Sequence, residues 1–268
     1  MSARAYELLA VPLRAARRAG VVWALCICAL IGLTVAFYPP FRDEADLAGL
    51  INGMPDALVQ AFGLSDFGTP AGFLRGNLYA VLVPLALAIA GVLLMNGQTA
   101  SDEDSGRMEA YLAQPVSRGA IFWGRVMAVS VWLVFIGLAM LAIQLVSDQV
   151  FGLHIPTDRV AATVALCILL AALHGGVAAA VAGLTGRPGL VMAIGMVIAV
   201  AGYVAVALFP ISDVLAPWRH ASPWDWALGG DPLINGAEAW RYLALAMPAV
   251  VLFAIGAMGF ARRDVRAA

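Results

Sequence analysis

Six long apolar runs dominate this sequence and constrain its fold more than any other feature. A helix needs about 20 mostly apolar residues to cross the hydrocarbon core of a bilayer. Six runs reach this length, at approximately residues 20–38, 77–97, 120–146, 160–184, 189–210 and 241–260. We therefore predict an all-α integral membrane protein, with six transmembrane helices in one domain spanning residues 1–268.

The charged residues exclude several classes of function. All 16 basic residues are Arg, so the chain has no Lys to hold nucleotide phosphates in a Walker A loop or to form a Schiff base. Only 12% of the residues are charged, whereas a soluble domain carries about 25%. The net charge of −1 gives no field that would attract nucleic acid, and we predict no nucleic-acid partner.

The distribution of Arg residues predicts the orientation in the membrane. If the N-terminus is cytoplasmic, the inner side holds eleven Arg residues and the outer side holds five. The outer residues are Arg42, Arg75, Arg159, Arg219 and Arg241. Because cytoplasmic loops carry the excess of positive charge, both termini and the loop at residues 98–119 are predicted to face the cytoplasm.

Residues 3–18 precede the first apolar run and show two distinct faces. On a helical wheel one arc is charged (Arg4, Glu7, Arg14, Arg17 and Arg18), and the other side is apolar (Tyr6, Leu9 and Leu13). This pattern suits an N-terminal interfacial helix with its Arg residues near anionic lipid headgroups. It suits a plain positively charged topology signal equally well.

The two larger outer loops, residues 39–76 and 211–240, are expected to form short helices that cap the outer end of the bundle. Trp218, Trp224 and Trp226 in the second loop suit the headgroup level of the membrane.

Few polar groups lie inside the predicted spans. His174 is the main ionisable residue, and no Asp or Glu lies well inside any run. An ion-coupled carrier usually needs such groups at the midplane, so this class is kept as an alternative only. A membrane-embedded enzyme is less favoured, because the sequence has no HExxH or GxSxG motif.

The three cysteines, Cys26, Cys28 and Cys167, suit buried hydrophobes. We predict no catalytic residues and no metal site.

The loop between the second and third runs is the strongest candidate for a functional segment. Asp102, Glu103 and Asp104 precede the stretch SGRMEAYLA, and acids favour the start of a helix. Gly106 would allow a bend, Pro115 would end the helix, and Ser117 would cap the next one. A short helix at about residues 103–114 could dock into a groove on a cytoplasmic partner, and a simple solvated loop explains the same charges equally well.

This loop resembles the second cytoplasmic segment of the ABC-2 type ABC-transporter permease family, which commonly reads E-x-E-x-G-T-L-E-x-L-L-x-x-P-V-S-R. The matching positions here are Asp102, Asp104, Gly106, Met108, Glu109, Tyr111, Leu112, Pro115, Val116, Ser117 and Arg118. Arg107 replaces a common Thr, and Ala110 and Tyr111 replace aliphatic residues. The segment SPWDWALGGDPLING is also similar to the last outer loop of such permeases, and the layout of six spans agrees over the whole chain.

The resemblance implies a membrane-spanning permease subunit in a bacterial inner membrane that pairs with a second permease copy, identical or not, within the lipid bilayer. Two cytoplasmic ABC ATPase subunits would bind ATP and Mg and drive export, while this chain would bind no cofactor. The residues expected to couple to the ATPase are Asp102, Glu103, Asp104, Gly106, Arg107, Met108, Glu109, Tyr111, Leu112, Pro115 and Arg118. The apolar spans suit a hydrophobic or amphipathic cargo, such as a drug, antibiotic or lipid, with His174, Trp132, Phe135 and Tyr203 as candidate residues of its path.

Overall fold

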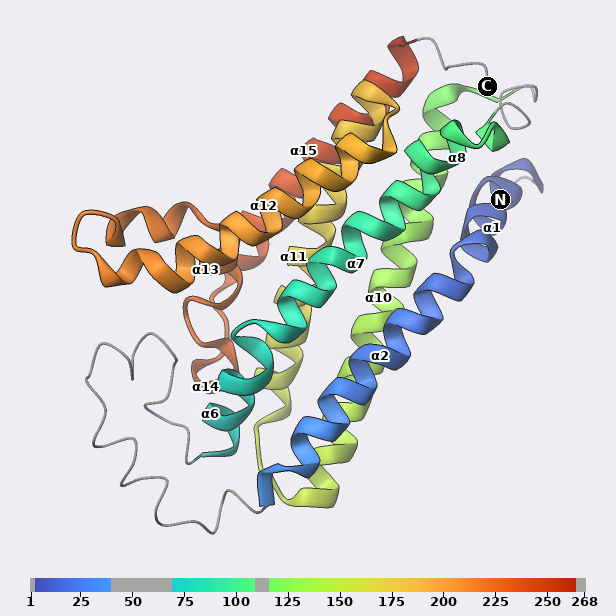
Figure 1. The fold of residues 1–268 in the computed structure, drawn as a ribbon. Coiled ribbons are helices and arrows are strands. Elements are labelled where there is room, and N and C mark those ends of the chain that lie inside the picture. Colours follow the sequence, from blue (N-terminus) through green and yellow to red (C-terminus); the bar gives the residue numbers. More distant parts are fainter. Residues whose placement is uncertain (1–2, 40–68, 109–115, 264–268) are drawn as a thin grey trace.

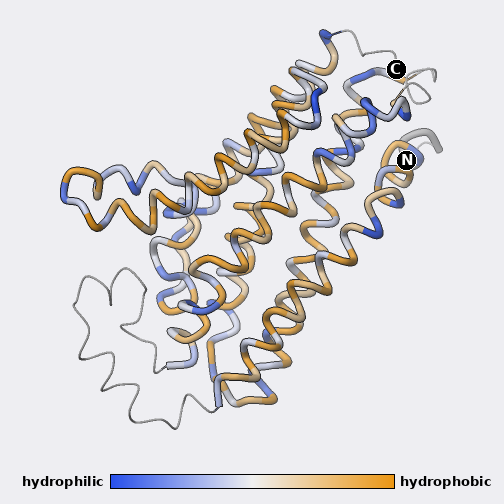
Figure 2. Tube along the Cα trace, viewed as in Figure 1, coloured by the Kyte–Doolittle hydropathy of each residue, from blue (hydrophilic) through white to orange (hydrophobic). Residues whose placement is uncertain are grey.

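The structure, a computed structural model, describes residues 3–39, 69–108 and 116–263. Within these ranges every regular element is a helix, and six helices are long and apolar enough to cross a membrane. Both termini lie at one end of the bundle, which we call the termini end (Figure 1). Hydrophobic residues run along the helices, and hydrophilic residues gather mainly near the helix ends (Figure 2). The predicted all-α membrane fold is confirmed.

The chain begins with α1 (Ala3–Ala15), which is followed by the first membrane helix α2 (Arg17–Ala36). Both helices pack lengthwise against α10 (Arg118–Phe151). The indole of Trp132 in α10 donates a hydrogen bond of 3.0 Å to the Leu13 carbonyl, and Gly124 lies against the Leu8 carbonyl. α1 is therefore fixed to the bundle by protein contacts.

The second membrane segment, Pro70–Asp104, is longer than predicted and is interrupted twice. It comprises α6 (Pro70–Leu74), a π-helical turn η2 (Arg75–Tyr79), α7 (Leu82–Gln98) and α8 (Ala100–Asp104). Pro84 lacks the N–H that would bond to Ala80, which explains the first break. This helical segment extends past the predicted span of 77–97 at both ends.

The remaining spans are α11 (Thr157–Thr185), α12 (Pro188–Leu208) and α15 (Ala239–Arg262). α10 begins where Ser117 accepts a hydrogen bond from the Ala120 N–H at 3.3 Å, as predicted. α10 and α11 end at Gly152 and Gly186, whose positive φ angles of 62° and 61° suit glycine. Except for the second segment, the spans lie within a few residues of their predicted ranges.

The centre of the bundle is α11, which packs most extensively against α15 and α7. Small residues permit this close approach, since a Cβ on Gly183 would lie 2.0 Å from the Gly256 carbonyl oxygen. Gly91 similarly lies against the Ala171 carbonyl. Dispersion contacts between closely packed backbones therefore hold the three central helices together.

Short helices cover the end opposite the termini. α13 (Pro223–Leu228) and α14 (Pro232–Asn235) lie at this end, and η3 (Phe209–Ile211) and η4 (Ala216–Ala221) lie on a projection beside it. Residues 205–221, which we call the lateral arm, project sideways from the bundle (Figure 1). The prediction of short helices holds for residues 211–240, whereas residues 40–68 of the other predicted loop lie outside the described ranges.

Candidate functional site

Two buried ion pairs hold α8 at the termini end of the bundle. Asp102 Oδ2 lies 2.7 Å from the guanidinium of Arg125 in α10, and Arg125 also donates to the Gln98 carbonyl. Glu103 accepts two hydrogen bonds from Arg263, which follows the end of α15. The Glu103 and Arg125 side chains are only 2% and 3% exposed, so both charges depend on these partners. We call these four residues the ion-pair cluster.

Backbone carbonyl groups complete the coordination of Arg263. Its Nε donates to the Gly183 carbonyl at 2.8 Å, and its Nη2 donates to the Ala182 carbonyl at 3.3 Å. A Cβ on Gly186 would lie 2.6 Å from the Arg263 guanidinium, so this position leaves space only for glycine. The Glu103–Arg263 pair therefore also connects α8 to the end of α11. The pair can be buried because the guanidinium and the carboxylate both have hydrogen-bond partners.

The start of α10, on the other side of the connecting loop in the chain, is also bonded to Arg263. Arg118, the first residue of α10, donates to the Arg263 carbonyl at 2.7 Å. Phe122, one turn later, contacts the ring of Phe260 with 5.6 Å between ring centroids. Both helices that flank residues 105–117 are consequently attached to α15, and a displacement of this segment would be transmitted to several spans.

The other predicted coupling residues are placed as follows. Asp104 is exposed, Met108 is buried, and Gly106 has a φ of 73° that makes the predicted bend. Arg107 is largely exposed and forms an ion pair with Asp102 at 2.7 Å within the chain, where the sequence suggested a pairing with a partner protein. Glu109, Tyr111, Leu112 and Pro115, and with them the second half of the predicted helix at 103–114, lie outside the described residues.

The candidate path residues are not brought together as one lining. The rings of Trp132 and Phe135 contact each other on α10, with Trp132 directed to α1. His174 is buried in α11 and bonds to the Leu170 carbonyl of its own helix at 2.8 Å. Only Tyr203 lines a cavity. A common role for these four residues stays a prediction.

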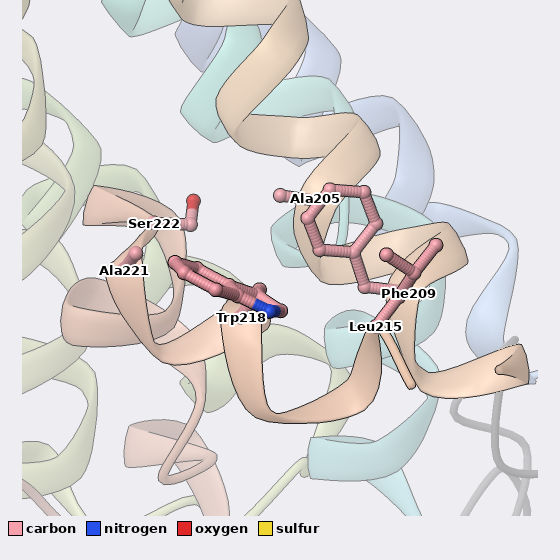
Figure 3. Close-up of a pocket in the computed structure, with 6 residues that line it drawn as sticks. All are labelled: Ala205, Phe209, Leu215, Trp218, Ala221 and Ser222. Atoms are coloured by element: carbon pink, nitrogen blue, oxygen red, sulfur yellow. The ribbon is translucent and has the colours of Figure 1, made fainter. Parts of the chain in front are cut away.

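A cavity of about 550 Å³ lies at the end opposite the termini, between η2, α11, α12, η3, η4, α13 and α14. Tyr79, Tyr203 and Trp224 contribute aromatic rings to its lining, and Arg75, Arg219, Asp225 and Asp231 contribute charges. Arg75 pairs with Asp231 at 2.8 Å. On the lateral arm, a separate and mainly apolar groove lies between Trp218 and the side chains of Phe209 and Leu215 (Figure 3).

Sequence reasoning missed Arg125, Arg263 and most residues of this cavity. Arg125 lies inside the predicted span of 120–146, and an ionisable residue at such a position is itself a signal. Arg263 carries no comparable signal, because it follows the last span among other Arg residues.

Comparison with known families gives a match over nearly the whole chain. The family model described as "Multidrug efflux system permease Rv1217c, C-terminal domain" matches residues 7–261. The chain belongs to this family. A comparison with curated proteins finds no match. The match confirms the ABC-2 type permease family inferred from the sequence, and it makes the chain a membrane permease of an efflux family.

Proposed function

We propose that this permease is the membrane subunit of an ATP-driven exporter, worked by two cytoplasmic ABC ATPase subunits that bind ATP and Mg. A second permease copy, identical or not, would complete the transporter. The family membership and the six spans support this assignment. The termini end would face the cytoplasm of a bacterial inner membrane, in agreement with the excess of Arg residues on that side.

The observation that carries the proposal is the ion-pair cluster, which joins the two helices that flank residues 105–117 in the chain. Asp102 and Glu103 on one flank are bonded to α10 and to Arg263 after α15, and Arg118 on the other flank meets the same Arg263. Movement of an ATPase against this segment would therefore shift α8, α10 and α15 together. Such a shift between two packings of the helices is what an alternating-access mechanism requires.

Asp104 offers a clean test because its side chain is exposed, unlike those of Asp102 and Glu103. We expect the Asp104→Arg variant to fold normally but to lower ATP turnover of the assembled complex about threefold, since it reverses a charge at the docking surface. Asp158→Arg is the matched control, because Asp158 is an exposed acid at the opposite end. Equal turnover in both variants would argue against coupling through this segment.

For the cargo, we propose a hydrophobic or amphipathic compound. The spans expose mainly apolar side chains, and the cavity at the opposite end combines aromatic walls with a few charged groups. Ligand pockets for such compounds have this composition and a volume of about 300–1,000 Å³.

A further inference from the structure

One cationic side chain in the lining of the cavity at the end opposite the termini, Arg219, is not part of an ion pair among the described residues. Asp231 is paired with Arg75, and Asp225 accepts a hydrogen bond of 2.9 Å from His220. Both carboxylates in the lining therefore have partners. Within the part of the chain that the structure describes, the side chain of Arg219, an exposed residue of the same lining, has no such partner.

The walls around this charge are aromatic and apolar. The Tyr79 hydroxyl is directed to Gln144 at 3.4 Å, so Tyr79 offers chiefly its ring to the cavity. The rings of Tyr203 and Trp224 contact each other with 5.4 Å between centroids. Val206 and Ile211 extend the apolar lining towards the lateral arm. A ligand would thus find an apolar surface for its body beside the guanidinium of Arg219.

The backbone next to the cavity is irregular in a way that is common at binding sites. Arg75, Gly76 and Tyr79 belong to the π-helical turn η2, and the helix is broken again at Ala80 and Val81. π-helical turns and interrupted membrane helices occur often where a ligand is bound.

The lateral arm indicates from which side a ligand arrives. Its side chains Ile211, Val214 and Trp218 are strongly exposed, at 69%, 78% and 65%. Apolar residues of this kind at the end of a membrane helix suit the hydrocarbon and headgroup region of the bilayer. Arg219 follows Trp218 directly, so the charged side of the cavity lies beside this lipid-facing surface.

We propose that this cavity binds an amphipathic anion, with its carboxylate or phosphate group at Arg219 and its apolar body against Tyr203 and Trp224. An acidic compound delivered for export and the headgroup region of an anionic phospholipid share this chemistry. The inference rests on the proposed function only where the ligand is taken as cargo. Binding itself requires neither ATP nor an ATPase.

The test uses the purified full-length permease in nanodiscs of zwitterionic phosphatidylcholine, without ATPase. The probes are the fluorescent fatty acid 11-(dansylamino)undecanoic acid and its methyl ester, which has the same apolar body but no charge. Empty nanodiscs give the background signal. We expect the acid to bind about fivefold more tightly than the ester, as fits one charge-assisted contact at a partly exposed site.

Three variants test whether Arg219 causes the tighter binding of the acid. Arg219→Gln should abolish the difference between acid and ester, whereas Arg219→Lys should keep most of it. Arg187→Gln, which removes an exposed Arg before α12 at the other end of the bundle, should bind both probes like the wild type. Equal binding of acid and ester by the wild type, or an unchanged preference in Arg219→Gln, would overturn the proposal.

Two further measurements test the role of the aromatic wall and the source of the ligand. Tyr203→Ala should weaken both probes equally, because it removes the aromatic wall and no charge. Competition with phosphatidylglycerol in the nanodisc identifies a lipid headgroup as the occupant if the acid is displaced, and a transported acid if it is retained. Normal binding together with uncoupled ATPase activity would contradict the proposed function alone.

Discussion

The two ends of this permease both contain Arg–carboxylate pairs, but in opposite environments. At the termini end, Glu103 and Arg125 are almost completely buried, and backbone carbonyl groups complete the bonding around Arg125 and Arg263. At the opposite end, Arg75 and Asp231 meet at the edge of a cavity, and Asp231 is 41% exposed. The same pair of groups therefore fastens helices at one end and leaves room for a ligand at the other.

This difference has an energetic basis. Removing one partner of a buried pair leaves an uncompensated charge away from water, whereas an exposed pair is screened and contributes little. The termini end should consequently resist local opening unless a partner drives it. The opposite end can change its contacts at little cost, which suits the binding and release of small molecules.

Breaking the Glu103–Arg263 pair should have the largest effect. We expect Glu103→Ala to destabilise the folded permease by about 3 kcal/mol, since Arg263 would lose its carboxylate partner within a mostly buried site. Thermal unfolding of the purified protein in detergent measures this change. The double variant Glu103→Arg with Arg263→Glu should recover part of the loss. An unfolding temperature equal to that of the wild type would contradict the stabilising role of the ion-pair cluster.

Widening the contact between α11 and α15 should have the second largest effect. A Cβ at Gly183 would overlap the Gly256 carbonyl oxygen, so Gly183→Ala should cost about 2 kcal/mol in the same unfolding measurement. Gly189→Ala is the matched control, because no atom beyond its own helical neighbourhood lies within 4 Å of a Cβ there. Equal stability of the two variants would mean that the close packing of the central helices has been overestimated.

The pair at the cavity should matter least for stability. Asp231→Asn removes the charge, and Asn tolerates the positive φ of 50° at this position. We expect a loss of about 0.5 kcal/mol, because the carboxylate is partly exposed and screened. A loss as large as that of Glu103→Ala would remove the distinction between the two ends.

The sequence predicted the spans well because a helix that crosses the hydrocarbon core needs a long run of apolar residues, and such a run is visible in the sequence itself. It failed at Pro70–Asp104, where a π-helical turn and a second break allow one segment to run through residues that look like loop. It also did not predict that Asp102 is buried and bonds to both Arg107 and Arg125. The ion pairs form where α8, α10 and the end of α15 pack together. The periodicity of residues within one helix cannot predict contacts between different helices.

The cavity could not be predicted for a related reason. Its lining comes from seven elements between residues 75 and 233, and most of its members look like ordinary loop or span residues. Tyr203 was selected from the sequence as an aromatic residue in an apolar span, and Arg219 was noted only as an outer positive charge. The structure gives both a common environment.

The central claim is that the end carrying residues 102–108 faces the cytoplasmic partner while the cavity opens on the other side of the membrane. Labelling with a membrane-impermeant maleimide in intact cells tests it directly, in a background where Cys26, Cys28 and Cys167 are replaced by Ala. The exposed residues Asp104 and Asp213 are each changed to Cys. The account predicts that the Asp213→Cys variant is labelled in intact cells and the Asp104→Cys variant only after permeabilisation. Labelling of Asp104→Cys from outside intact cells would contradict it.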